Sequence, residues 1–299
     1  MTAVSSFRSG FVVLAGRPNV GKSTLVNRLV GQKVAITAAV PQTTRTRLQA
    51  IVTLPHAQLI FVDTPGIHHP RHRLGEKMVR DARHALLDAD VIVFMLDATA
   101  GVTPEDETVA RALKGAGTPV VVALNKMDRV EPMALTALAS VVGALGNFQA
   151  VLPISAAAGT NVDRLLEMLV GLLPEGPQYF PPEMLTDQSE QFLARELIRE
   201  QAIKLTREEL PHSVAVEIEE FADRPGKDLT YIRATLHVER DSHKKMLIGR
   251  EGRLLKEIGR LARREIEALL ERRVYLDLWV KTSKDWRDKD ELIRAFYPE

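Results

Sequence analysis

A glycine-rich run near the start of the chain has the spacing of a phosphate-binding loop. It lies between an apolar stretch over 11–15 and a helical pattern over 25–30, and it contains Gly16, Arg17, Pro18, Asn19, Val20, Gly21, Lys22, Ser23 and Thr24. In the spacing G-x-x-x-x-G-K-[ST], backbone N–H groups point inward and bind the α- and β-phosphates, assisted by the N-terminus of the following helix. Lys22 is placed to reach the β- and γ-phosphates, and the Ser23 hydroxyl to bind Mg²⁺. The sequence therefore predicts a nucleoside triphosphate site.

A second group of polar and turn residues closes the buried-strand pattern over 59–62. It consists of Asp63, Thr64, Pro65 and Gly66. An aspartate at the end of a strand beside a phosphate-binding loop can reach Mg²⁺, typically through water, and the N–H of Gly66 can contact a γ-phosphate. We therefore expect a Mg²⁺ site formed by Ser23, Thr44 and Asp63.

A guanine-recognition pattern follows the third buried-strand run, over 120–124. Asn125, Lys126 and Asp128 have the spacing N-K-x-D. The Asp128 carboxylate can accept hydrogen bonds from guanine N1–H and the exocyclic amine, and the stem of Lys126 can cover the base plane. A fourth strand-like run, over 150–154, precedes three residues whose N–H groups can meet guanine O6: Ser155, Ala156 and Ala157. An ordinary polar strand exit would explain N-K-x-D alone, but all these elements in order predict GTP.

Two polar segments flank the strand that ends in Asp63. The first, over 31–46, is rich in threonine and includes Gln42, Thr43, Thr44 and Arg45; the second, over 68–73, is charged and rich in histidine. Composition alone would fit two ordinary surface loops. Their positions on either side of this strand instead favour the two switches of a GTPase, which the γ-phosphate and Mg²⁺ order and hydrolysis releases.

The elements that must position these residues alternate between strand and helix over about 8–173. Strand patterns cover 11–15, 48–53, 58–62, 91–96, 120–124 and 150–154, with helical patterns over 22–30, 74–88, 105–115, 132–145 and 161–172. This alternation predicts a doubly wound α/β domain with a mostly parallel sheet, occupying residues 1–177. Four prolines within 174–182 would not be tolerated inside a helix or strand and mark a linker.

The remaining residues, 183–299, predict a smaller α+β domain of the type II KH class. The expected order is helix (187–205), strand (214–221), strand (230–239), short helix (242–248), loop, long helix (253–271) and strand (274–282). The loop has the G-x-x-G pattern that places a nucleic-acid backbone against main-chain N–H groups. A simple helix–turn–helix joint would also explain G-x-x-G, but Arg240–Arg264 contains nine Lys or Arg against three Asp or Glu. This local positive charge favours RNA binding.

We expect single-stranded RNA to lie between this loop and the strand over 230–239. The candidate contacts are Lys244, Lys245, Ile248, Gly249, Arg250, Glu251, Gly252 and Arg253. The formal net charge of the whole chain is only +1, which excludes a globally basic nucleic-acid coat.

Composition fits a cytoplasmic chain of two domains. Its 299 residues correspond to two domains of ordinary size, and 45% of them are hydrophobic, enough for real cores. There is no cysteine, which excludes disulfides, a thiol nucleophile and Cys-based metal sites. We find no secretory signal pattern and no apolar run approaching the ~18 residues that a membrane span needs. The tail over 286–299 has apolar residues that we expect to pack on the second domain.

Over nearly its full length the sequence resembles the Era family of bacterial ribosome-assembly GTPases. The resemblance rests on the motifs at 16–24, 41–45, 63–66, 125–128 and 155–157, together with the tract over 186–200 and the loop over 248–252. The resemblance implies GTP-dependent binding to the 3′ end of 16S ribosomal RNA on the 30S subunit, alternation between GTP and GDP, and slow intrinsic hydrolysis. It also implies loose peripheral contact with the inner membrane. We further expect a monomer.

Ile67 stands where Ras-like enzymes have a water-orienting glutamine, so that role must be filled elsewhere. Related GTPases that carry an asparagine at the position of Asn19 bind a potassium ion near the β- and γ-phosphates. Such an ion could partly replace an arginine finger. Asn19 could instead only brace the loop, and the sequence leaves both roles open.

Two other functions compete with a hydrolysing switch. In the first, the nucleotide is a fixed structural ligand and the protein an RNA chaperone, but Lys22, Ser23, Thr44 and Asp63 are all present, and a structural site need not keep them. In the second, the protein modifies tRNA, but the two predicted domains leave no sequence for a further catalytic domain.

Overall fold

The computed structural model describes residues 7–67, 70, 72–114, 117–226 and 228–297. These residues form two compact units. The first contains the described residues of 1–35, 44–69 and 77–187, and the second contains those of 36–43, 70–76 and 188–299. Within the described ranges, no helix is both long and apolar enough to cross a membrane.

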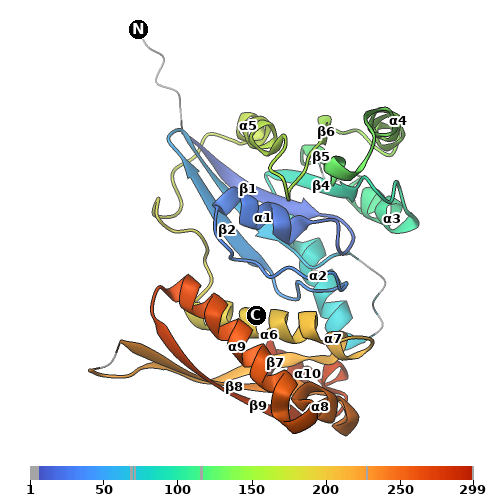
Figure 1. The fold of residues 1–299 in the computed structure, drawn as a ribbon. Coiled ribbons are helices and arrows are strands. Elements are labelled where there is room, and N and C mark those ends of the chain that lie inside the picture. The colour runs from blue at the N-terminus through green and yellow to red at the C-terminus, as the bar shows by residue number, and fades with distance from the viewer. Residues whose placement is uncertain (1–6, 68–69, 71, 115–116, 227, 298–299) are drawn as a thin grey trace. The chain divides into compact units, whose positions relative to one another are not determined.

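The first unit is built on a six-stranded sheet with the strand order β2-β3-β1-β4-β5-β6 (Figure 1). The strands are β1 (Arg8–Ala15), β2 (Leu48–Leu54), β3 (Ala57–Asp63), β4 (Val91–Asp97), β5 (Val120–Asn125) and β6 (Ala150–Pro153). Neighbouring strands run parallel except for β2 and β3, which pair antiparallel. β3, β4 and β5 are buried along their whole length, which explains their continuous apolar sequences. Parallel pairing brings the carboxyl ends of these strands to one edge of the sheet.

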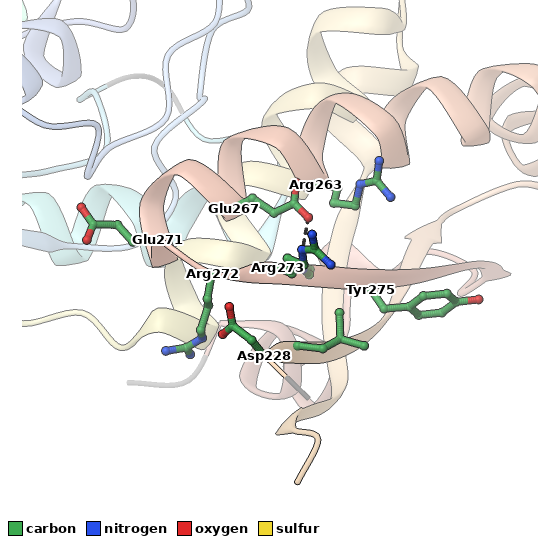
Figure 2. Close-up of a pocket in the computed structure, with 9 residues that line it drawn as sticks. Asp228, Arg263, Glu267, Glu271, Arg272, Arg273 and Tyr275 are labelled. Atoms are coloured by element: carbon green, nitrogen blue, oxygen red, sulfur yellow. Dashed lines mark hydrogen bonds between the residues drawn. The ribbon is translucent and has the colours of Figure 1, made fainter. Parts of the chain in front are cut away.

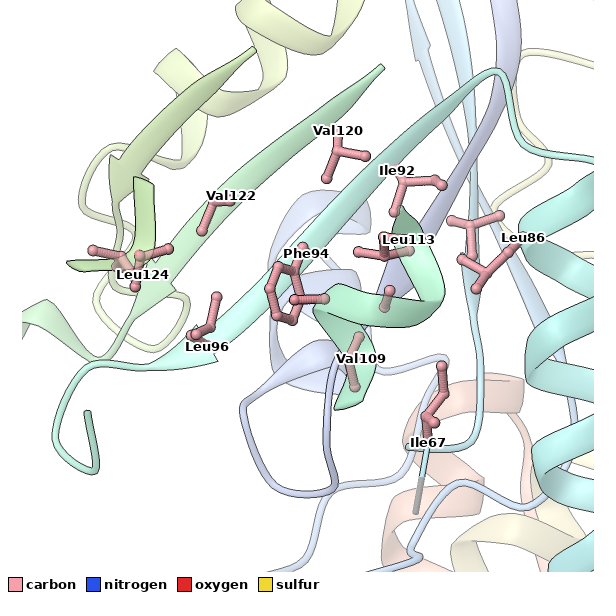
Figure 3. Packing of buried hydrophobic residues seen from close by; sticks show 14 of the residues in the cluster. Ile67, Leu86, Ile92, Phe94, Leu96, Val109, Leu113, Val120, Val122 and Leu124 are labelled. Atoms are coloured by element: carbon pink, nitrogen blue, oxygen red, sulfur yellow. The ribbon is translucent and has the colours of Figure 1, made fainter. Parts of the chain in front are cut away.

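Helices cover both faces of this sheet, as the alternating pattern predicts. They are α1 (Lys22–Val30), α2 (Arg73–Leu87), α3 (Pro104–Leu113), α4 (Pro132–Gly143) and α5 (Val162–Leu172), with a 3-10 turn η1 (Met127–Arg129). Side chains of α2, α3 and α4 pack with β4 and β5 in one apolar cluster that includes Phe94, Val109 and Leu124 (Figure 3). Val13 belongs to this cluster, whereas its neighbour Val12 points to the opposite face, because side chains alternate along a strand. α1 and α5 contact the strands as well.

The proline-rich segment predicted as a linker is fastened to the first unit by a buried glutamine. Gln58 of β3 is 0% exposed. Its Oε1 atom accepts hydrogen bonds from the N–H groups of Tyr179 (2.8 Å) and Phe180 (2.9 Å), and its Nε2 atom donates to the Phe180 carbonyl (2.9 Å). The Gln58 side chain therefore supplies hydrogen-bond partners to backbone groups that have none in a regular helix or strand.

The second unit is an α+β fold with a three-stranded sheet. Its elements are α6 (Glu190–Leu205), α7 (Leu210–Ser213), β7 (Ala215–Asp223), β8 (Leu229–Val238), α8 (Asp241–Ile248), a 3-10 turn η2 (Arg250–Gly252), α9 (Arg253–Leu270), β9 (Arg273–Thr282), a 3-10 turn η3 (Trp286–Asp288) and α10 (Asp290–Phe296). The sheet order is β7-β8-β9, antiparallel between β7 and β8 and parallel between β8 and β9. Ile232, Ala234 and Leu236 of β8 form the core together with apolar residues of α6, α8 and α9.

The tail packs on this unit, as the sequence predicts. Trp286, Phe296 and Tyr297 are buried. The indole N–H of Trp286 donates to the Ser213 carbonyl at 2.8 Å, and its ring meets that of Phe296 edge-on at 5.5 Å. The tail thereby extends the core of the second unit.

Candidate functional site

The loop between β1 and α1 has the backbone conformation that its glycines allow. Gly16 (φ 151°), Asn19 (φ 64°) and Gly21 (φ 105°) all have positive φ. A Cβ atom on Gly21 would lie 2.2 Å from Nδ2 of Asn125, so both the conformation and the space require glycine. α1 begins at Lys22, and its N-terminus therefore faces the predicted phosphate position.

Lys22 is buried within this loop and is held by its carbonyl groups. The Nζ atom donates to the carbonyls of Gly16 and Arg17, each at 3.1 Å. Burial lowers the pKa of Lys22 to about 8, although Asp63 opposes this shift and Arg17 adds to it. An ammonium group in such a place gains from the arrival of an anionic ligand.

The three predicted Mg²⁺ ligands converge. The Ser23 hydroxyl donates to Oδ2 of Asp63 at 2.7 Å, and the Thr44 hydroxyl lies 3.0 Å from that of Ser23 and 3.3 Å from the same carboxylate oxygen. They come from α1, the segment before β2 and the end of β3. The sequence-predicted grouping is therefore present in the fold.

The chemistry of this cluster fits a divalent cation. Asp63 is 0% exposed, and its Oδ1 atom is buried without a hydrogen-bond partner among the residues that the structure describes. Burial raises the pKa of Asp63, against the lowering effects of Lys22, Ser23 and Thr44. A buried carboxylate beside two hydroxyl groups is a set of oxygen ligands that Mg²⁺ prefers.

The turn after β3 lies directly against the phosphate-binding loop. A Cβ atom on Gly66 would lie 2.6 Å from the backbone nitrogen of Pro18, so only glycine fits. Thr64 is buried and donates to the Leu14 carbonyl at 3.0 Å, and Pro65 is buried beside it. Asp63, Thr64, Pro65 and Gly66 thus form one packed turn beside the loop.

Ile67 belongs to the apolar cluster of the first unit. It is 5% exposed and packs in the cluster that includes Val109 and Leu86 (Figure 3). The structure therefore gives a packing reason for an apolar residue at this position. His68, His69 and Arg71 of the predicted second switch lie outside the described residues.

The predicted first switch is divided between the two units. Thr44 and Arg45 belong to the first unit, and Arg45 is buried there. Gln42 and Thr43 belong to the second, where Gln42 has a left-handed backbone (φ 64°) and the Thr43 hydroxyl donates to the Val40 carbonyl at 2.6 Å. No pattern in the sequence predicted this division.

Asn125 connects two loops of the predicted guanine site. Its Nδ2 atom donates to the Val20 carbonyl at 2.7 Å, and its Oδ1 atom accepts from the N–H of Ala156 at 2.9 Å. Asn125 is therefore a brace between the phosphate-binding loop and the loop after β6. Asp128 is the more accessible acceptor, and a hydrogen bond from Ser155 lowers its pKa, so it is ionised at neutral pH.

The three N–H groups predicted to meet guanine O6 are not equivalent. The N–H of Ser155 donates to the Thr160 carbonyl at 3.0 Å, and that of Ala156 donates to Asn125. Both groups already have acceptors within the protein. Reading of guanine O6 by the N–H groups of Ser155, Ala156 and Ala157 stays a prediction.

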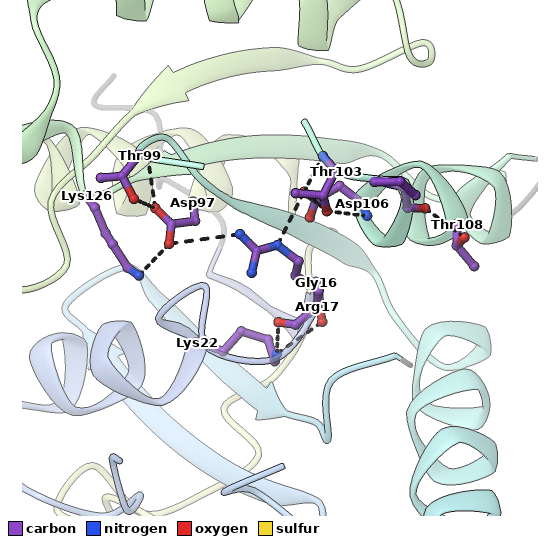
Figure 4. A network of polar contacts seen from close by, with 10 residues as sticks. Gly16, Arg17, Lys22, Asp97, Thr99, Thr103, Asp106, Thr108 and Lys126 are labelled. Atoms are coloured by element: carbon purple, nitrogen blue, oxygen red, sulfur yellow. Dashed lines mark hydrogen bonds and ion pairs between the residues drawn. The ribbon is translucent and has the colours of Figure 1, made fainter. Parts of the chain in front are cut away.

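A polar network beside this site was missed in the sequence analysis. Arg17, Asp97, Asp106 and Lys126 form it (Figure 4). The sequence did contain a sign of Asp97, because the buried apolar run of β4 ends in this residue, as the runs of β3 and β5 end in Asp63 and Asn125.

The G-x-x-G loop of the second unit has the backbone expected of it. Gly249 (φ 72°), Glu251 (φ 54°) and Gly252 (φ 74°) have positive φ between α8 and α9. A Cβ atom on Gly249 would lie 2.8 Å from the Cβ atom of Leu254. A Cβ atom on Gly252 would have no neighbour within 4 Å among the described residues. Glu251 pairs with Arg253 at 2.9 Å.

The remaining predicted RNA contacts surround this loop on the surface. Lys245, Arg250 and Arg253 are exposed, while Lys244 and Ile248 are half-buried. The exposed cations lie on both sides of the two glycines. The structure therefore brings the predicted residues into one surface region.

A groove of about 370 Å³ runs beside α9, and its wall is β9. Its lining includes Lys256, Gly259 and Arg260 of α9 and Leu276 and Leu278 of β9. The strand over 230–239 was expected here, but β8 is central in the sheet and its residues fill the core. None of the residues that line this hollow belongs to the G-x-x-G loop, so the expected RNA groove with a wall at 230–239 stays a prediction. A second hollow of about 610 Å³ shares Arg263 and Tyr275 with this groove (Figure 2).

Two family models match the chain, one in each part. The model described as "50S ribosome-binding GTPase" matches residues 11–126, and the model described as "KH domain" matches residues 209–287. These matches agree with the α/β and α+β folds described above.

Similar proteins cover nearly the whole chain. GTPase Era of Halothermothrix orenii is 51% identical and that of Alkaliphilus oremlandii 45%, each match spanning 97% of this chain and 98% of the relative. A crystal structure of Era in complex with MgGDPNP and nucleotides 1506–1542 of 16S ribosomal RNA has a TM-score of 0.95 at 42% identity, over 97% of this chain and 98% of that one. A variant of Aquifex aeolicus Era bound to GDP and AlF₄⁻ has a TM-score of 0.94 at 42% identity, over 97% and 99%. The chain therefore belongs to the Era family of GTPases.

Proposed function

We propose that this protein is a GTP-hydrolysing switch that binds 16S ribosomal RNA near its 3′ end during assembly of the 30S subunit. The main observation in support of hydrolysis is that Ser23, Thr44 and Asp63 converge near the buried Lys22. A purely structural nucleotide site needs no such set of Mg²⁺ ligands. The RNA partner rests on the Era relative whose structure contains nucleotides 1506–1542 of 16S ribosomal RNA.

In the nucleotide site, this chain's residues bind and orient GTP. Lys22 and the loop N–H groups hold the phosphates, Ser23 and Thr44 would hold Mg²⁺, and Asp63 would act on it through water. When bound, Mg²⁺ neutralises charge that develops on the transferred phosphoryl group. Asp128 reads the guanine edge, and the N–H of Gly66, fixed against Pro18, faces the γ-phosphate.

We further propose that Asn19 holds a potassium ion at the phosphates. Its left-handed backbone (φ 64°) places it at the apex of the loop, and Ile67 is buried in the core and is unable to orient water by hydrogen bonding. A cation at this place would stabilise negative charge on the leaving phosphate, as an arginine finger does.

In the second unit, RNA lies over the G-x-x-G loop and continues along the groove between α9 and β9. Gly249 and Gly252 allow the close approach of the RNA backbone, and Lys244, Lys245, Arg250 and Arg253 offer charge to phosphates. Apolar side chains of β9, such as Leu276, face the bases. Glu251 pairs with Arg253, so the flanking lysines supply most of the attraction.

Two measurements test this function on the full chain. GTP turnover with Mg²⁺ separates a hydrolysing switch from a chaperone with a fixed nucleotide, which would show none. Crosslinking to a 16S 3′-end RNA with GTP or GDP bound, followed by mapping of the crosslinked residues, tests the RNA site. Crosslinks confined to the first unit would overturn the RNA assignment.

A further inference from the structure

Asp97, the last residue of β4, contacts two cationic side chains that come from different loops (Figure 4). Its Oδ2 atom accepts a hydrogen bond from the Lys126 ammonium at 2.5 Å and lies 4.0 Å from Nη2 of Arg17. Its Oδ1 atom accepts from the N–H of Thr99 at 3.0 Å and from the Thr99 hydroxyl at 2.6 Å. The carboxylate is therefore fixed from one side and binds cations on the other.

The position of Asp97 follows from the pairing of β4 with β5. Asp97 is paired with Asn125 in the strand register, so the next residue of the chain, Lys126, lies close to Asp97. Lys126 has a left-handed backbone (φ 67°), which is unfavourable for a residue with a side chain. A long, flexible lysine side chain has many rotamers, and a fixed carboxylate restricts them.

Arg17 is held at its other end by α3. Its Nε atom lies 3.4 Å from Oδ2 of Asp106, which is fully buried. Asp106 also forms the capping box of α3, accepting from the N–H (3.0 Å) and hydroxyl (2.8 Å) of Thr103. Arg17 thus reaches from the phosphate-binding loop to two carboxylates on neighbouring elements.

Asp97 stays ionised in this setting. Burial alone would raise the pKa of Asp97, but hydrogen bonds from Lys126 and Thr99 outweigh burial and lower it. A charged acceptor makes stronger hydrogen bonds than a neutral amide, so the contact with both cations depends on the carboxylate.

We propose that Asp97 is a positioning residue that joins guanine recognition to phosphate recognition, holding Lys126 for the base plane and Arg17 for the phosphate-binding loop. The inference rests on the proposed binding of guanine nucleotides. Because Asp97 orders both side chains before the ligand binds, less side-chain conformational entropy is lost on binding. It touches neither the base nor the phosphates in this role.

The test is a pair of double-mutant cycles on the full chain, read as GDP affinity. Asp97→Asn should weaken GDP binding about tenfold, the effect of one charge-assisted hydrogen bond. If Asp97 acts through Lys126, the double variant Asp97→Asn/Lys126→Met should bind no more weakly than Lys126→Met alone. The same non-additivity should hold for Asp97→Asn with Arg17→Gln. Asp90→Asn is the matched control, because Asp90 accepts a hydrogen bond from the Phe11 N–H at 2.7 Å, which is a structural contact between β1 and the residue that precedes β4.

Inosine diphosphate, which lacks the exocyclic amine of guanine, separates positioning from reading of the base edge. Asp97→Asn should weaken GDP and inosine diphosphate by the same factor, whereas Asp128→Asn should change their ratio. Additive effects with Lys126→Met would overturn the inference, and additive effects with Arg17→Gln alone would overturn the link to the phosphate-binding loop. Failure of the unaltered protein to bind GDP would instead refute the proposed function.

Discussion

The hydroxyl of Ser23 donates a hydrogen bond to the carboxylate of Asp63 at 2.7 Å, which joins the start of α1 to the end of β3. Each of these groups has a second role when a cation is present, since both can act as oxygen ligands or orient a ligating water. In the nucleotide-free protein the bond partly compensates a buried negative charge. The pair therefore links the stability of the fold to the chemistry of the site.

This link makes Asp63→Asn act in opposite directions on stability and activity. Burial raises the pKa of Asp63 above its unfolded value, so this carboxyl group costs stability once the pH exceeds the unfolded pKa, and the amide removes that cost. We expect the nucleotide-free variant to melt at a higher temperature, while Mg²⁺-dependent GTP hydrolysis falls about 10–100-fold, the range for groups that support a bound metal. Thermal unfolding and turnover are measured on the same sample. A variant that lost both stability and activity would contradict this account.

The affinity for GDP should fall as the pH rises through about 8. Lys22 has a pKa of about 8 in the free protein, and bound phosphates raise it by favouring the charged form. Below pH 8 the lysine is already protonated and affinity is constant, whereas above it binding must take up a proton, which costs up to about tenfold per pH unit. Calorimetric titrations from pH 7 to 9 measure this slope. Lys22→Met should bind weakly with a shallower slope, and that variant also corrects for titration of the base.

Asp128→Asn should shift base preference from guanine to xanthine. The carboxylate accepts two hydrogen bonds, whereas an amide accepts one and donates one, which matches a ring carrying a carbonyl in place of the amine. We expect GTP to lose about 10–100-fold in affinity and xanthosine triphosphate to gain. Competition binding of the two nucleotides measures the exchange. An unchanged preference for GTP would remove Asp128 from the base site.

Hydrolysis should be faster in potassium than in sodium if Asn19 holds a cation. Asn19→Ala should abolish the difference between the two salts, but alanine is strained at φ 64°. Asn19→Gly is therefore the cleaner variant, because glycine adopts this conformation freely. Turnover is compared at equal ionic strength. Equal rates for the unaltered protein in both salts would leave Asn19 as a brace of the loop.

Replacing Arg250 and Glu251 together by aspartate should abolish RNA binding and spare GDP binding. The change puts negative charge against RNA phosphates, and the two units have separate cores. Gly252→Ala and Gly249→Ala form a matched pair, since only the second adds a clash, with Leu254, to the strain of positive φ. Salt-dependent filter binding to a 16S 3′-end RNA reports each effect. Unaltered affinity and salt dependence in the double variant would refute the loop as the RNA site.

The sequence predicted most of the nucleotide site because its residues stand at strand ends. β1, β3 and β5 are apolar runs whose parallel pairing places Asp63 and Asn125 at one edge. The motifs also predicted the convergence of Ser23, Thr44 and Asp63 that the structure shows. Spacing alone could not show that the side-chain amide of Asn125 occupies the N–H of Ala156, because that depends on the approach of two loops.

Other features depended on tertiary structure. The sequence did not predict the hollow between α9 and β9, which forms because a parallel crossover through α8 and α9 places β9 beside α9. Arg17 lies inside a recognised motif, yet its partner Asp106 is 89 residues away. Such long-range pairs leave no periodic signal in a single sequence.

The contact of Gly66 with Pro18 has a mechanical consequence. A Cβ atom on Gly66 would lie 2.6 Å from the nitrogen of Pro18 and 2.8 Å from Cγ and Cδ of its ring, so the two segments leave no space for a side chain at this point. Two surfaces in hard contact transmit displacement directly, because neither can yield without the other moving. We therefore expect the turn after β3 and the phosphate-binding loop to move together. A displacement of one segment on loss of a phosphate would displace the other.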